Sequence, residues 1–204
     1  ARPRAMIVAD LPFGTFQRGP QVTLDASIRL MQEANAEAVK IEGAGPRLAS
    51  IETVASQDIP VWAHLGLTPQ SVHGFGGHRV QGKESQSAHR ILEQARRVES
   101  AGACALVLEC IPHELAGEIT RTLAIPTIGI GAGPECDGQV LVFHDLLGFD
   151  KSFVPRFVRQ YAQMEDLIPE ALRSFVNDVR EGSFPTLEES YASAKELAKK
   201  ARRR

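Results

Sequence analysis

Short runs of apolar residues recur along the chain, and most of them end at an acidic or polar residue. The runs lack the apolar–polar alternation of half-exposed strands, which is typical of strands buried on both faces. Each predicted strand is given with the polar residue that follows it: 5–9 with Asp10, 38–41 with Glu42, 61–63 with His64, 105–108 with Glu109, and 140–144 with Asp145. A further strand is predicted from Pro126 into the glycine-rich segment 129–133.

Between these runs, apolar residues recur with the spacing of helices. The clearest helix is predicted over 85–101, where Ile91, Leu92, Ala95 and Val98 fall on one side and Gly102 follows as a terminator. Thr23 is predicted to cap the helix that follows the first strand. Helices are also predicted over 47–57, 112–123 and 153–180, the last broken near Pro169, and a long loop is predicted over 68–83.

Strands that alternate with helices predict a parallel sheet covered by helices, with about six strands in the 204 residues. A doubly wound sheet is one arrangement. A (β/α)8 barrel without its first units fits better, because polar residues end nearly every strand and barrel strands converge on one rim. We expect one catalytic barrel domain over 1–204, with C-terminal helices and a basic tail over 150–204. The first strand begins so near residue 1 that a preceding segment is expected.

Composition narrows the class of protein further. Hydrophobic residues make up 43% and charged residues 24%, as in an ordinary soluble globular protein. The net charge of -2 argues against general attraction to nucleic acid or to an anionic membrane. No run approaches the ~18 apolar residues of a membrane span. Three cysteines without metal-site spacing, together with no visible leader, predict reduced thiols and a cytoplasmic protein. The basic tail, 195–204, is read as a solvated helix rather than a binding segment.

Acidic residues at one rim would repel each other. If Asp10, Glu42, Glu109 and Asp145 share that rim, either a divalent cation or protonation must relieve the repulsion. Oxygen ligands alone favour Mg²⁺ or a similar hard ion. Taken singly, each carboxylate is explained as well by a buried salt bridge or a helix cap as by a functional role.

Three other features allow both a structural and a functional interpretation. Lys40 can face the same way as Glu42 and needs an anionic partner, either Glu42 itself or a substrate carboxylate. His64 is more typical of a satisfied core histidine than of a ligand. The 129–133 loop resembles a phosphate cradle but is equally typical of a tight barrel turn.

Six segments together resemble the ketopantoate hydroxymethyltransferase family. They are VADLPF (8–13), VKIEG (39–43), HLGLTPQSV (64–72), RVQG (79–82), LVLECIP (106–112) and IGIGAGPECDGQ (128–139). The resemblance extends from about residue 5 to residue 190. It implies a barrel of the phosphoenolpyruvate/pyruvate type assembled as a homodecamer, and pantothenate biosynthesis as the pathway.

The resemblance also implies a reaction and a set of site residues. The reaction is hydroxymethyl transfer from 5,10-methylenetetrahydrofolate to 3-methyl-2-oxobutanoate, which yields 2-dehydropantoate. By motif, Asp10 and Glu42 correspond to Mg²⁺ ligands, Asp10 and Lys40 to substrate-binding positions, and Glu109 to the catalytic proton acceptor. These residue types suit the chemistry, since Mg²⁺ chelated by the 2-oxo acid stabilises an enolate and a carboxylate can remove the proton.

The sequence departs from the family in one respect. Family members begin with two further β-α units, including a Gly-Asp-Ser segment whose Asp is another metal ligand, and this segment is not present here. Two alternatives therefore accompany the main interpretation. One is a different Mg²⁺-dependent lyase of the same superfamily acting on 2-oxo acids. The other is a truncated barrel that serves as an inactive scaffold.

Overall fold

A computed structural model describes residues 5–193 of the chain. The chain divides into two compact units, Ala1–Leu141 and Val142–Arg204. The basic tail predicted over 195–204 lies outside the described residues. The six strands found among residues 5–193 all belong to the first unit, which also carries every residue of the predicted site except Asp145.

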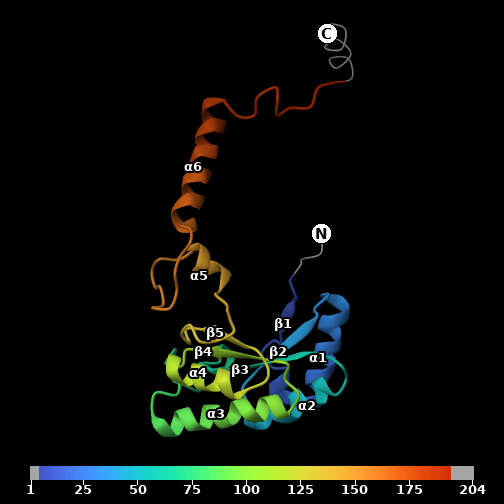
Figure 1. Ribbon diagram of the computed structural model, residues 1–204. Helices are drawn as coiled ribbons and strands as arrows, with labels where there is room; N and C mark the ends of the chain where they lie inside the picture. The colour runs from blue at the N-terminus through green and yellow to red at the C-terminus, as the bar shows by residue number, and fades with distance from the viewer. Residues whose placement is uncertain (1–4, 194–204) are drawn as a thin grey trace. The chain divides into compact units, whose positions relative to one another are not determined.

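The first unit is built on one parallel sheet whose strands pair in the order of the chain (Figure 1). Its strands are β1 (Val8–Asp10), β2 (Ala38–Glu42), β3 (Val61–Gly66), β4 (Ala105–Glu109), β5 (Thr127–Ile130) and β6 (Gly138–Gln139). Consecutive parallel strands joined by helices are the arrangement of a (β/α)8 barrel segment, as predicted, whereas a doubly wound sheet reverses its strand order. The barrel-type fold and the count of six strands are confirmed.

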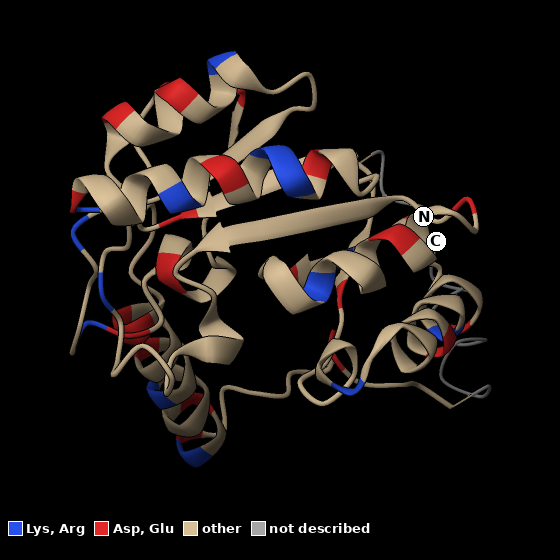
Figure 2. Ribbon diagram, turned by 90° about the horizontal axis from the view of Figure 1, so that it is seen from below, with Lys and Arg blue, Asp and Glu red and all other residues tan. Residues whose placement is uncertain are grey.

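Helices follow the strands and cover one face of the sheet. They are α1 (Pro20–Glu33), α2 (Leu48–Ala55), α3 (Ser85–Ser100) and α4 (His113–Thr122), with short 3-10 turns η1 (Phe16–Arg18), η2 (Gly45–Arg47) and η3 (Pro69–Ser71). The predicted stripe on α3 is buried and joins one hydrophobic core with α2 and α4. Residues of both charges are interspersed along the helices, as expected for a solvated outer layer (Figure 2).

Alternation along the strands separates the hydrophobic core from the site. Ile41, Leu65 and Leu108 point toward the helices and are almost completely buried in the core. Their neighbours in the chain point to the opposite face, because successive strand residues alternate. Glu42 and Glu109 are such neighbours. The same pattern that builds the core therefore places charged groups together on the other side of the sheet.

The predicted cap at Thr23 is wrong. Helix α1 begins at Pro20, after Gly19, whose φ of 105° is accessible to glycine and whose position suits the turn into a proline-started helix. Thr23 lies inside the helix, where its hydroxyl donates a hydrogen bond to the Gly19 carbonyl at 2.8 Å and lies 3.1 Å from Ser50 Oγ.

The strand predicted before Asp145 is also wrong. Pairing with β5 ends at Gln139 apart from a bond between Val140 N and the Gly129 carbonyl, and residues 143–147 form helix α5 (Phe143–Leu147). The ring of Phe149 packs against those of Phe143 and His144, with centroids 6.0 and 5.0 Å apart, which stabilises the helical turn. A short apolar run does not distinguish a strand from a helix by periodicity.

The second unit contains α5 and α6 (Met164–Glu181). Segment 153–163, predicted as helical, is not helical, and α6 continues through Pro169 instead of breaking there. Proline removes a single backbone donor, and the neighbouring bonds maintain the helix. None of the helices in the described part of the chain has the length and hydrophobicity required to cross a membrane.

At Gly66 the end of β3 lies very close to the end of β4. Its φ is +92°, and a side chain there would overlap the Glu109 carbonyl oxygen and lie 2.8 Å from Ile111 Cγ2. Gly14 has the same φ of +92°, but a Cβ added there would have no neighbouring atom within 4 Å. We predict that Gly66→Ala lowers the free energy of unfolding by about 3 kcal/mol or more, whereas Gly14→Ala lowers it by about 1–2 kcal/mol. Urea unfolding measures both, and equal losses would contradict the close approach.

Candidate active site

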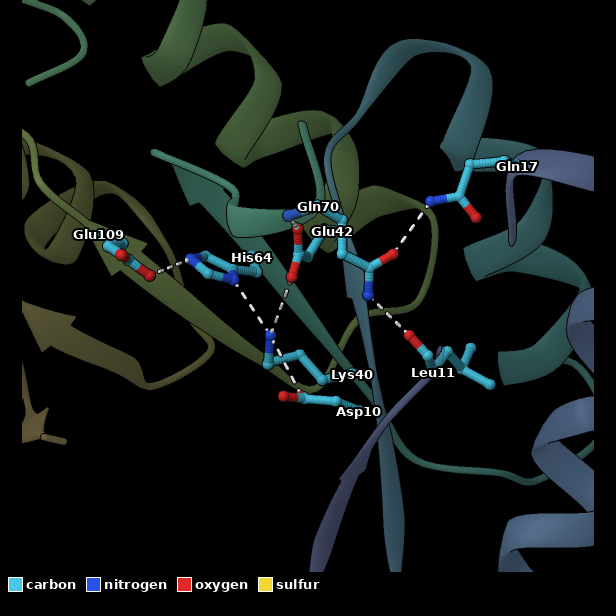
Figure 3. A network of polar contacts seen from close by, with 8 residues as sticks. All are labelled: Asp10, Leu11, Gln17, Lys40, Glu42, His64, Gln70 and Glu109. Carbon is cyan, nitrogen blue, oxygen red and sulfur yellow. Dashed lines mark hydrogen bonds and ion pairs between the residues drawn. The ribbon is translucent and has the colours of Figure 1, made fainter. Parts of the chain in front are cut away.

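Five charged or titratable side chains from four adjacent strands meet where the strands end (Figure 3). They are Asp10 from β1, Lys40 and Glu42 from β2, His64 from β3, and Glu109 from β4. The parallel register pairs Asp10 with Lys40 and Glu42 with His64. The prediction that Asp10, Glu42 and Glu109 converge on one rim is confirmed. We call these five side chains the rim cluster.

Lys40 is the centre of the rim cluster. Its side chain is 15% exposed, and its ammonium lies 3.2 Å from Asp10 Oδ1 and 3.8 Å from Glu42 Oε1. The same ammonium lies 3.1 Å from His64 Nδ1. A largely buried cation needs such partners, because an unpaired buried charge destabilises a protein by about 3–5 kcal/mol. Glu42 is therefore one partner of Lys40, as one of the two predicted interpretations requires.

The contact with Lys40 determines the protonation of His64. An ammonium only donates hydrogen bonds, so Nδ1 must accept and carries no proton. The neutral ring then carries its proton on Nε2, which lies 3.2 Å from Glu109 Oε2. That distance allows electrostatic attraction, but the geometry does not align a hydrogen bond, and Nε2 is the one buried side-chain polar atom without one among residues 5–193. His64 is therefore not a satisfied core histidine.

Glu42 is fixed from the loop that follows β3. The Gln70 backbone N–H donates to Glu42 Oε2 at 2.9 Å, and the Gln70 side chain donates to the Leu11 carbonyl at 2.8 Å. Gln17 in turn donates to Gln70 Oε1 at 3.0 Å. Sequence reasoning missed Gln17 and Gln70 as parts of the site, although Gln70 lies inside one of the motif segments.

The donors at the rim suit a hard cation. Asp10 and Glu42 both direct carboxylate oxygens at one positive group, and Asp10 is 64% exposed and so accessible from solvent. The carboxylates of the rim cluster outnumber its ammonium by two, a surplus that a divalent cation offsets. Within residues 5–193 no three His, Cys, Asp or Glu side chains form a metal-binding group. Mg²⁺ commonly uses one or two protein carboxylates, with water and substrate oxygens completing its shell.

Two predicted features have another place in the structure than the sequence suggested. Asp145 lies in α5 of the second unit, so it does not end a strand of the sheet. The glycines of the 129–133 loop serve packing: a side chain at Gly133 would overlap His113, and Gln139 Nε2 donates to the Gly133 carbonyl at 2.9 Å. These contacts favour the interpretation of this loop as a tight turn.

The pKa of the Cys110 thiol is sensitive to the charge of Glu109. It follows Glu109 directly, adopts a φ of 49°, and is 9% exposed. Burial raises the pKa of the Cys110 thiol, and the negative charge of Glu109 raises it further, to about 11. The thiol is therefore protonated and unreactive at neutral pH.

The sequence is similar to proteins of one enzyme family. The family model described as ketopantoate hydroxymethyltransferase matches residues 1–187. The 3-methyl-2-oxobutanoate hydroxymethyltransferase of Trichlorobacter lovleyi is 54% identical over 192 residues, which cover 94% of this chain and 72% of that protein. The enzyme of the same name from Salinibacter ruber is 50% identical, covering 92% of this chain and 71% of that protein.

A solved structure shares the fold at low sequence identity. It is a proposed phosphonomutase from Burkholderia cenocepacia, with a TM-score of 0.53 and 13% identity, covering 88% of this chain and 70% of that one. At this identity the likeness supports the fold alone.

The charge on Glu109 can be tested without activity. We predict that Glu109→Gln lowers the pKa of Cys110 below about 11, because it removes the negative charge while burial persists. Alkylation of Cys110 by iodoacetamide should then rise at lower pH than in the wild type, followed by peptide mass spectrometry. Cys104 is the internal control, since its pKa is raised mainly by burial and not by Glu109. An unchanged Cys110 profile would contradict a charged Glu109.

Proposed function

Because the chain belongs to the ketopantoate hydroxymethyltransferase family, we propose that it transfers a hydroxymethyl group from 5,10-methylenetetrahydrofolate to 3-methyl-2-oxobutanoate. The methylene carbon bonds to C3 of the keto acid in place of a proton, water supplies the hydroxyl group, and tetrahydrofolate and 2-dehydropantoate are released. The observation that supports this proposal most is the rim cluster, which joins a cation-binding pair of carboxylates to a further carboxylate through a histidine.

Asp10 and Glu42 would hold Mg²⁺ in this proposal. They are the two carboxylates that contact the Lys40 ammonium, and their hard oxygen donors match the preference of the ion. When bound, Mg²⁺ polarises the 2-oxo group and makes the neighbouring C–H bond more acidic. Asp10 and Lys40 would bind the keto acid, with the ammonium of Lys40 neutralising the substrate carboxylate.

Glu109 would accept the proton from C3. It is 15% exposed at the end of β4, which combines apolar surroundings with access to the rim. His64 would orient the reactants: its Nε2–H lacks a hydrogen-bond acceptor and lies beside Glu109. Lys40 would maintain that tautomer from the other side of the ring. The chain's own residues thus supply a base, an orienting donor and a cation.

The wider setting is also a proposal. The family suggests a homodecamer working in the cytoplasm in pantothenate biosynthesis. No observation favours a lyase of the same superfamily, because the relatives that are about half identical are named hydroxymethyltransferases.

We predict that Glu109→Gln reduces turnover about 10²–10⁴-fold, the usual contribution of a positioned general base, and leaves keto-acid binding intact. The substitution retains the size of the side chain and removes only its basicity. Formation of 2-dehydropantoate measures turnover, and isothermal titration with 3-methyl-2-oxobutanoate in the presence of Mg²⁺ measures binding.

Three outcomes decide between the interpretations. Near-normal turnover of the variant would exclude Glu109 as the base. Loss of binding together with turnover would assign Glu109 to substrate binding or folding instead. Absence of keto-acid and Mg²⁺ binding by the wild-type chain would identify an inactive scaffold.

A further inference from the structure

A cavity of about 380 Å³ lies beside the rim cluster, within the size range of small-molecule sites. Its walls come from the turn after β2, the loop after β3, and one face of α3. Glu42 belongs to this wall and also contacts Lys40, so the cavity adjoins the position where the keto acid is proposed to bind. A ligand that fills the cavity can therefore present a reactive group at the rim.

Two arginines give the cavity a positive lining. Arg47 stands at the end of η2 with its guanidinium carbon 5.6 Å from the centre of the Phe16 ring, and Arg90 projects from α3. Among residues 5–193, neither guanidinium forms a salt bridge or a side-chain hydrogen bond. Glu42, the carboxylate in the cavity wall, already contacts Lys40 and the Gln70 backbone. Unpaired guanidiniums are well suited to bind carboxylates or phosphates.

Neutral hydrogen-bonding groups accompany the arginines. Thr68 lines the cavity with only 4% exposure, and its hydroxyl has no side-chain partner among the described residues. Ser87 and Gln94 line it from α3 with Arg90 between them, on one face of the helix. These hydroxyl and amide groups can hydrogen-bond a polar ligand that enters the cavity.

We infer that this cavity binds the glutamyl carboxylates of the folate donor, with Arg47 and Arg90 as their partners. The inference rests on the proposed function and extends it to the second substrate. A folate has its pterin and its glutamate at opposite ends, so anchoring the anionic end here leaves the one-carbon unit free to reach the rim cluster. Bidentate guanidinium–carboxylate pairing supplies affinity and direction. The cavity is therefore a specificity site for glutamylated folates.

The test compares two ligands that differ only in the glutamate. Isothermal titration with tetrahydrofolate and with tetrahydropteroate, which lacks the glutamate, is carried out on the full chain and on Arg47→Gln and Arg90→Gln. Each variant should bind tetrahydrofolate about tenfold more weakly, as expected when a charge-assisted hydrogen bond is removed, and tetrahydropteroate as the wild type does. Arg96→Gln, on α3 but not in the cavity wall, is the matched control and should change neither affinity.

The failure of this inference differs from that of the proposed function. If the wild type binds both ligands but the arginine variants bind both unchanged, the cavity does not hold the glutamate and the proposed function stands. Equal weakening of both ligands would likewise overturn the glutamate assignment. If the wild type binds neither ligand, although it binds the keto acid with Mg²⁺, folate is not its substrate.

Discussion

The rim cluster depends on the partial burial of one ammonium group. Lys40 lies on a central strand with 15% of its side chain exposed, so its charge must be met by Asp10, Glu42 and His64. The parallel register makes this feasible, because it places Asp10 level with Lys40 and His64 level with Glu42. Asp10 and Glu42 are in turn held by the cation, and Glu109 lies beside His64 instead. The cation thereby reduces the repulsion that three carboxylates at one rim would otherwise produce.

Backbone hydrogen bonds attach the loop after β3 to the end of β4, and the loop in turn positions the rim cluster. The Leu67 backbone N–H donates to the Glu109 carbonyl at 2.8 Å, and that of Gln81 donates to the Cys110 carbonyl at 2.9 Å. Between these two bonds, Gln70 fixes Glu42. Gly66 approaches the Glu109 backbone closely in the same region. These backbone contacts together position the candidate base and the wall of the neighbouring cavity.

The sequence predicted the sheet and most of the rim because one physical pattern encodes both. Apolar strands buried on two faces are recognisable, and a polar residue at the end of each marks the edge where parallel strands converge. Short apolar runs are ambiguous, which explains the error at Asp145, and local glycine and proline chemistry displaced the predicted cap at Thr23. Gln70 contacts Glu42 through its backbone, and Arg47 and Arg90 come to line one cavity only when the chain folds. No local sequence pattern therefore identifies these residues. The metal, the folate donor and the decamer remain proposals.

The tautomer of His64 tests the central claim most directly. Solid-state ¹⁵N NMR of histidine-labelled protein, with the His64 signals assigned by their loss in His64→Gln, distinguishes protonated from unprotonated ring nitrogens. We predict an unprotonated Nδ1 and a protonated Nε2 in the wild type, because Nδ1 accepts from the Lys40 ammonium. That preference should weaken in Lys40→Met. A wild-type ring protonated on Nδ1 would contradict the contact with Lys40, and with it the account of how the rim cluster is held together.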